Sequence, residues 1–213
     1  MASRLLILGS GSFAVEALDI AELMGTFEVL GFVNSVDRIL PSTLHSGLPV
    51  YSTDTLPAAP DDCMIVAGIV SNKRRAFVEQ VSALGYRAAT LVHPSSVVSP
   101  RATIGEGCII GAAAVVASNT RLQPHVILNR GCLVGHGNDI GAFSTVGPGA
   151  NIAGTVTVGE NAYIGVGAVV RDRLSIGACA VVGAGSVVVK AVDPYTLVAG
   201  VPAKVIRTGV HGL

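Results

Sequence analysis

Histidine is the residue type here with the widest chemical range, because a neutral imidazole near physiological pH can accept a proton or bind a metal. The chain holds five: His45, His93, His125, His136 and His211. A catalytic zinc would need about three protein ligands that converge on one ion. His125 and His136 are eleven residues apart, and no third histidine lies in the repetitive region around them. We therefore expect no metal cofactor.

The four cysteines, Cys63, Cys108, Cys132 and Cys179, form no Cys-x-x-Cys pair. We interpret them as reduced thiols that fill small apolar spaces. No cysteine or serine is placed convincingly as an acyl carrier. The start of the chain also lacks an export signal, since Arg4 precedes only four apolar residues before Gly9. These features predict a cytoplasmic protein.

A glycine-rich segment near the N-terminus could hold phosphate. Gly9-x-Gly11-x-x-Ala14 lies between an apolar run and a helical pattern, a junction where backbone amides and the helix dipole favour phosphate. NAD-binding proteins usually carry Asp or Glu at the end of the second strand, where this chain has Asn34. We therefore favour a nucleotide diphosphate over NAD, with a purely structural turn as the remaining alternative.

Strands and helices alternate along the first part of the chain. Apolar runs predict strands at 5–8, 29–33, 64–67 and 88–92, and helical patterns span 15–24 and about 71–84. This alternation predicts a small parallel α/β sheet that resembles a Rossmann-like domain.

The second part repeats every six residues. From Val98 to Val188, sixteen consecutive positions in steps of six are Ile, Leu or Val. Gly or Ala often follows, and a small residue usually lies two positions before. A period of six fits neither a helix nor simple strand alternation. It fits short strands joined by tight turns, three to a coil of about 18 residues, and so predicts a parallel β-helix with a narrow aliphatic interior.

Charge and hydropathy exclude two other classes. Fourteen Lys and Arg balance fourteen Asp and Glu, and the longest basic run is 73–75, which argues against nucleic-acid binding. Every apolar stretch is interrupted well short of about 18 residues, so no transmembrane helix is expected.

The two parts, joined by His93-Pro94-Ser95 and followed by Gly200-Val201-Pro202-Ala203-Lys204, resemble a known family. It is the bacterial hexapeptide-repeat nucleotide-sugar N-acetyltransferases, related to bacillosamine and perosamine N-acetyltransferases and sialic acid O-acetyltransferases. The resemblance implies a left-handed β-helix, a homotrimer, acetyl-CoA between neighbouring subunits and a nucleotide-linked amino sugar on the first domain. We expect a nucleotide-sugar domain at 1–92, the β-helix at 93–193 and a tail at 194–213 near the CoA site.

The resemblance also assigns catalytic roles. His136 matches the general base that takes a proton from the sugar amine, and Asn129 matches an asparagine that precedes this base by six intervening residues. Gly154, one coil further, should stack about 5 Å from His136 and donate its N–H to the thioester carbonyl. Relatives follow the histidine with Glu or Asp, but this chain has Gly137. Asp139, or a neighbouring subunit, could supply the missing acid.

Further residues match binding positions of the family. Those expected to bind the nucleotide sugar are Gly9, Ser10, Gly11, Ser12, Phe13, Asn34 and Asn72. Those expected to bind acetyl-CoA are Thr145, Gly165, Val166, Gly183, Ala184, Gly200, Pro202 and Lys204. Phe13 and Thr145 stand where many relatives have histidine, so the sugar and nucleotide stay open.

Two other functions remain open. The same residues could acetylate a hydroxyl of a sugar or of sialic acid, because the amine or hydroxyl belongs to the acceptor. The absence of an acid at Gly137 also allows a non-catalytic scaffold that binds a nucleotide sugar.

Overall fold

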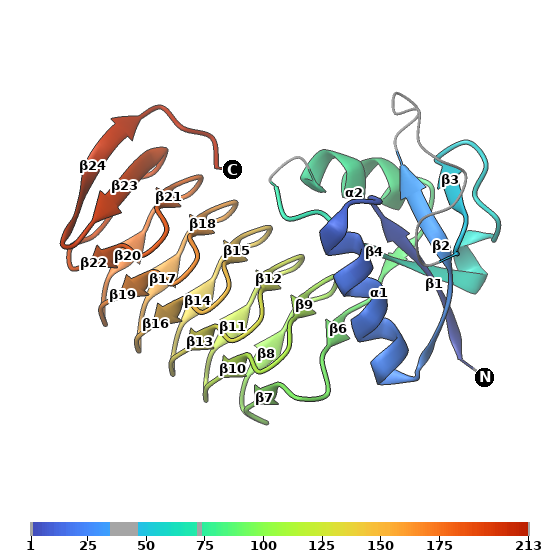
Figure 1. The fold of residues 1–213 in the computed structure, drawn as a ribbon, viewed down its shortest axis with the longest axis horizontal. Coiled ribbons are helices and arrows are strands. Elements are labelled where there is room, and N and C mark those ends of the chain that lie inside the picture. The colour runs from blue at the N-terminus through green and yellow to red at the C-terminus, as the bar shows by residue number, and fades with distance from the viewer. Residues whose placement is uncertain (1, 35–46, 72–73, 213) are drawn as a thin grey trace. The chain divides into compact units, whose positions relative to one another are not determined.

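The computed structural model describes residues 2–34, 47–71 and 74–212. The chain forms two compact units, Met1–Pro94 and Ser95–Leu213 (Figure 1). Within the described ranges no helix is long and apolar enough to cross a membrane.

The first unit is built on a five-stranded parallel sheet of order β3-β2-β1-β4-β5. Its elements are β1 (Ser3–Leu8), α1 (Ser12–Met24), β2 (Phe27–Asn34), β3 (Val50–Ser52), a 3₁₀ turn η1 (Pro60–Asp62), β4 (Cys63–Ala67), α2 (Arg74–Ser82) and β5 (Arg87–Ala88). The strand order reverses at β1, so the loops after β1 and β4 share the carboxyl edge, where open α/β sheets bind ligands. This unit confirms the predicted α/β architecture.

One strand prediction for this unit is wrong, and two short elements were missed. The strand predicted at 88–92 is wrong, because β5 ends at Ala88 and a separate strand, β6 (Leu91–Val92), begins three residues later. β3 and η1 were not predicted, because three residues are too few to show a period. The predicted end of the first helical pattern at residue 24 is confirmed: Gly25 adopts φ 65° and donates its N–H to the Glu22 carbonyl.

The second unit is a left-handed parallel β-helix whose two-residue strands stack in three faces (Figure 1). Face 1 holds β7 (Val97–Val98), β10 (Val115–Val116), β13 (Leu133–Val134), β16 (Asn151–Ile152), β19 (Val169–Val170) and β22 (Val187–Val188). Face 2 holds β8 (Thr103–Ile104), β11 (Arg121–Leu122), β14 (Asp139–Ile140), β17 (Thr157–Val158) and β20 (Ser175–Ile176). Face 3 holds β9 (Ile109–Ile110), β12 (Ile127–Leu128), β15 (Thr145–Val146), β18 (Tyr163–Ile164), β21 (Val181–Val182) and β23 (Thr196–Gly200).

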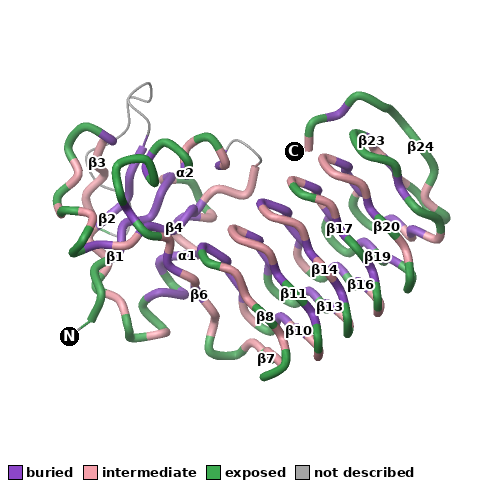
Figure 2. The backbone as a smooth tube through the Cα atoms, turned by 180° about the vertical axis from the view of Figure 1, so that it is seen from behind, coloured by how far each residue is buried: buried purple, intermediate pink, exposed green. Residues whose placement is uncertain are grey.

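The repeating aliphatic residue is the second residue of each strand from β7 to β22 and points inward. From Ile110 onward these residues are buried, whereas Val98 and Ile104 of the first coil are partly exposed (Figure 2). The glycines that follow allow close stacking: a Cβ on Gly141 would lie 2.5 Å from the Glu160 amide nitrogen. The six-residue period therefore arises from one inward side chain and one tight turn per strand.

Each coil has three corners, which we name by one residue. The His136 corner joins faces 1 and 2, the Ser144 corner joins faces 2 and 3, and the Asn129 corner joins faces 3 and 1. At each corner from Gly107 to Gly185 the residue three before the aliphatic position has positive φ, whether it is glycine or, like His125 at 61°, another residue.

The C-terminal residues belong to the same unit. β23 continues face 3 beside β21, and β24 (Ala203–Thr208) pairs with β23 in antiparallel fashion. The segment expected as a tail at 194–213 thus begins as part of the β-helix and continues as the β23–β24 hairpin, after which the Gly212 N–H donates to the Cys179 carbonyl.

Candidate active site

His136 lies at the corner after β13, and its side chain is exposed. Strand pairing places the next coil in register, since the Thr155 N–H donates to the His136 carbonyl over 2.8 Å. A Cβ on Gly154 would lie 2.6 Å from Nε2 and 2.7 Å from Cε1 of His136. The predicted stacking of these two residues is confirmed, and glycine at 154 leaves room for the imidazole to lie over the backbone.

The Gly154 amide complements this imidazole. Within the described residues its N–H donates to no acceptor. The nitrogen Nε2 and a hydrogen-bond donor therefore sit side by side on the surface of one corner. Such a pair can take a proton from one atom and stabilise negative charge on another.

The structure does not bring Asp139 to His136. Asp139 opens β14 on face 2, and its carboxylate accepts a hydrogen bond from Gln123 Nε2 at 3.1 Å. In the described part of the chain, the His136 ring has no hydrogen bond or ion pair with any acid. Gly137 has φ 66°, a conformation that glycine adopts without strain.

The Asn129 corner gathers most of the residues expected to bind acetyl-CoA. The register of face 3 sets Asn129, Gly165 and Gly183 in one column, with Val166 and Ala184 just beyond. Val166 is half exposed, whereas Asn129 is buried and accepts the Arg130 N–H at 2.8 Å. Asn129 and His136 therefore lie at successive corners of one coil, on either side of face 1.

The remaining expected CoA residues fall in two places. Thr145 is buried on face 3. Gly200, Pro202 and Lys204 are exposed at the turn between β23 and β24, beyond the end of the Asn129 column. Glycines 165 and 183 also serve packing, since a Cβ on Gly165 would lie 2.6 Å from the next coil.

At the carboxyl edge of the first unit's sheet, Ser10 meets Asn34. Ser10 Oγ donates to Asn34 Oδ1 at 3.1 Å and Asn34 Nδ2 donates to Ser10 Oγ at 2.9 Å. Gly11 caps α1, and no described atom lies within 4 Å of where its Cβ would stand. The first turn of α1, with Ser12 and Phe13, carries no acid. This loop presents amides and a positive helix end, as phosphate requires.

The neighbouring loop after β4 holds this loop in place. A Cβ on Gly68 would lie 2.6 Å from Ala14 Cα, and a Cβ on Gly9 would lie 2.6 Å from Ile69. The buried Arg74 guanidinium donates to the Val70 carbonyl at 2.7 Å. The sequence did not reveal this arginine, because a basic run is usually a solvated surface. Asn72 lies outside the described residues.

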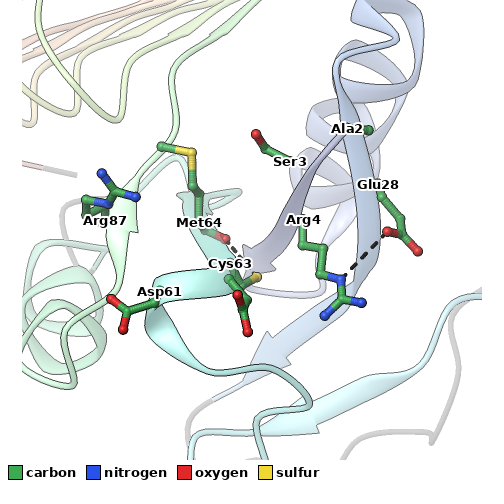
Figure 3. Close-up of a pocket in the computed structure, with 9 residues that line it drawn as sticks. Ala2, Ser3, Arg4, Glu28, Asp61, Cys63, Met64 and Arg87 are labelled. Atoms are coloured by element: carbon green, nitrogen blue, oxygen red, sulfur yellow. Dashed lines mark hydrogen bonds and ion pairs between the residues drawn. The ribbon is translucent and has the colours of Figure 1, made fainter.

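A cavity of about 560 Å³ opens at the opposite, amino edge of the same sheet (Figure 3). The cations that line it lie among acids. Arg4 Nε lies 3.8 Å from Glu28 Oε2, and both Arg87 and Asp61 line the cavity. This charge balance does not suit a diphosphate, so the carboxyl edge is the better candidate for a nucleotide.

Two buried polar residues beside His136 were not predicted. Asn138 is 1% exposed and bonds both to the Gly135 carbonyl and to the Val156 N–H, while Thr120 also donates to Gly135. Their signal in the sequence is a polar residue two before the aliphatic position. Among the described residues, no group of three or more His, Cys, Asp or Glu could hold a metal ion.

Comparison with known proteins finds matches that cover both units of this chain. Residues 4–81 match the family model of the PglD N-terminal domain. GDP-perosamine N-acetyltransferase of Escherichia coli O157:H7 is 32% identical over 164 residues, which cover 74% of this chain and 73% of that protein.

Two solved structures match nearly the whole chain. PerB of Caulobacter crescentus, in complex with CoA and GDP-perosamine, is 32% identical with a TM-score of 0.88 over 97% of this chain and 99% of that chain. The acetyltransferase domain of PglB from Neisseria gonorrhoeae FA1090, in complex with acetyl coenzyme A, is also 32% identical, with a TM-score of 0.88 over 97% and 100%.

Proposed function

The chain belongs to the hexapeptide-repeat family of nucleotide-sugar N-acetyltransferases, and from this we propose that it transfers an acetyl group from acetyl-CoA to the amino group of a nucleotide-linked amino sugar. The observation that carries the proposal is the contact between His136 and Gly154, which sets a base nitrogen beside an amide N–H with no partner among the described residues.

In this reaction the amine attacks the thioester carbonyl directly. A C–N bond forms, the carbonyl oxygen becomes an oxyanion, and the Gly154 N–H stabilises it. His136 Nε2 takes the proton that the amine loses. The C–S bond then breaks, and the CoA thiolate leaves and is protonated. Direct attack needs no acyl-enzyme. Burial raises the pKa of the Cys132 thiol to about 12 and that of Cys63 to about 11, so these two thiols are poor nucleophiles.

The Asn129 column supports an acetyl-CoA site. Gly165, Val166, Gly183 and Ala184 form a line along one corner that ends at the β23–β24 turn. We propose that the pantetheine arm follows this line and that Gly200, Pro202 and Lys204 contact the adenine end. The loop of residues 9–13 and Asn34 would hold the diphosphate of the sugar nucleotide.

The outer side of face 1 supports a homotrimer. Val97, Leu133 and Val169 point outward there and are 64%, 42% and 41% exposed. If three copies turn face 1 toward a common axis, the Asn129 corner of one subunit meets the His136 corner of the next. Such an arrangement would bury the valines and leucine and would unite the two halves of the site.

We also propose that the protein works in the cytoplasm. The four cysteines are thiols, and three of them are buried. Unpaired cysteines agree with a reducing compartment.

The test is CoA release from acetyl-CoA with a panel of nucleotide amino sugars, for the wild type, His136→Ala and His125→Ala. We expect release with one amino sugar, a fall of about 10³-fold in His136→Ala and little change in kcat for His125→Ala. His125 is the matched control, because it packs on Phe143 with ring centroids 4.6 Å apart at a corner without expected site residues. Release only with hydroxyl acceptors would indicate O-acetylation, and no binding of acetyl-CoA would contradict the proposal.

A further inference from the structure

The turn that carries His136 is flanked by two glycines. Gly135 must be glycine because a Cβ there would lie 2.8 Å from the Ala153 carbonyl carbon, and Gly137 has positive φ. Glycine loses more conformational freedom on folding than any other residue. A base on such a turn needs other groups to hold its backbone.

Asn138 supplies such a group. Its Nδ2 donates to the Gly135 carbonyl at 3.0 Å, and its Oδ1 accepts the Val156 N–H at 2.6 Å. A carbonyl can only accept and an N–H can only donate, so both partners define the same orientation of the amide. Thr120 Oγ1 donates to the same Gly135 carbonyl at 2.7 Å.

We propose that Asn138 is a positioning residue for the base, an inference that rests on the proposed function. The Gly135 carbonyl belongs to the peptide group that ends at the His136 nitrogen. Val156 follows Gly154 by two residues. One buried amide therefore ties the peptide before the base to the segment that carries the oxyanion donor, and it does so where the acid at position 137 is missing.

The repeat provides a matched comparison at the Ser144 corner. Ser144 occupies the same place in its hexad as Asn138 does, donates to the Gly159 carbonyl at 2.7 Å and accepts the Ala162 N–H at 3.1 Å. A hydroxyl at this place therefore links forward to the next coil, whereas the Asn138 amide also reaches back to the carbonyl three residues earlier. In Asn138→Ser we expect the hydroxyl to keep the Val156 link and to turn to the Ala153 carbonyl, so that Thr120 alone would hold the Gly135 carbonyl.

The experiment compares Asn138→Ser, Asn138→Ala and Ser144→Ala for kcat, both KM values and Tm. We expect Asn138→Ser to lower kcat roughly tenfold to a hundredfold, because small displacements of a base are costly, with KM and Tm close to wild type. Asn138→Ala should lower kcat as much and also lower Tm by several degrees, because it removes both buried hydrogen bonds of the amide. Ser144→Ala should lower Tm alone.

NMR of the ¹³C-labelled His136 ring gives a readout that needs no turnover. We expect its resonance to shift or broaden in Asn138→Ser and to stay unchanged in Ser144→Ala. Wild-type kcat with an unchanged His136 resonance in Asn138→Ser would overturn the proposal, as would equal losses of kcat in Asn138→Ala and Ser144→Ala. Failure of the proposed function would differ, since the wild type itself would then release no CoA.

Discussion

The His136 corner and the Ser144 corner share one hexad frame but treat histidine in opposite ways. At the Ser144 corner, His125 stacks on the ring of Phe143 with an interplanar angle of 16°. C-terminal residues also join this corner, where the Gly212 N–H donates to the Cys179 carbonyl. At the His136 corner the imidazole instead lies over Gly154 and stays exposed. One corner packs its two rings against each other, and the other leaves its single ring exposed.

Faces 1 and 2, which meet at the His136 corner, also differ, because the outer side of face 1 is apolar and that of face 2 is polar. This difference allows the test with the largest expected effect. Leu133→Glu places a charge on the apolar outer side of face 1 and should convert the proposed trimer to monomers, because burying an unpaired carboxylate is costly. We expect CoA release to fall by more than about a hundredfold when the half-sites separate. Sedimentation would measure the state of assembly.

Thr157→Glu is the control, since Thr157 is exposed on face 2 among polar neighbours such as Ser175. It should leave both assembly and kcat unchanged. A Leu133→Glu protein that stays trimeric and active would show that face 1 is not the interface.

Gly154→Ala tests the contact that distinguishes the His136 corner. The new methyl group would collide with the imidazole, so we expect kcat to fall roughly tenfold to a hundredfold and Tm to fall. The three atoms nearest to that methyl position all belong to His136. In a His136→Ala background the same substitution should therefore leave Tm unchanged, which a thermal double-mutant cycle measures.

Alkylation of the cysteine thiols is expected to have the smallest effect on kcat. Cys132 lies inside the Asn129 corner with a pKa raised by burial to about 12, and Cys63 has a pKa of about 11. Their thiolate fractions at pH 8 are about 10⁻⁴ and 10⁻³, rising tenfold with each pH unit, so iodoacetamide should leave both unmodified. Cys179 at the Ser144 corner is partly exposed, and its alkylation should change kcat by no more than about twofold. Mass spectrometry of the modified, still active enzyme checks both points.

Sequence could predict what the repeat dictates. Because a coil has about 18 residues and parallel strands pair in register, Gly154 was predicted to stack on His136 without coordinates. The same logic placed the aliphatic interior, whereas Gly165 and Gly183 came from the family resemblance. The stacking and the interior depend on backbone periodicity, which each hexad repeats.

Sequence could not predict contacts that depend on a side chain's direction. Asp139 is three residues from His136, yet β14 starts a new face there, and the carboxylate bonds to Gln123 instead. Asn138 was missed because its two partners lie three residues before and 18 residues after it. Arg74 was missed because only the fold buries it at the edge of the sheet.

Because each coil adds the same rise along the axis, the number of coils sets the distance between two residues at the same corner. His136, Gly154 and Lys190 lie at one corner at multiples of 18 residues, so His136 and Lys190 are three coils, or about 14 Å, apart along the axis. Inserting or deleting one coil between them would preserve every packing rule of the fold. It would nevertheless move the β23–β24 turn by about 4.8 Å relative to the proposed base, farther than a hydrogen bond can follow. In the proposed complex, the number of coils between His136 and this turn would therefore have to match the length of CoA.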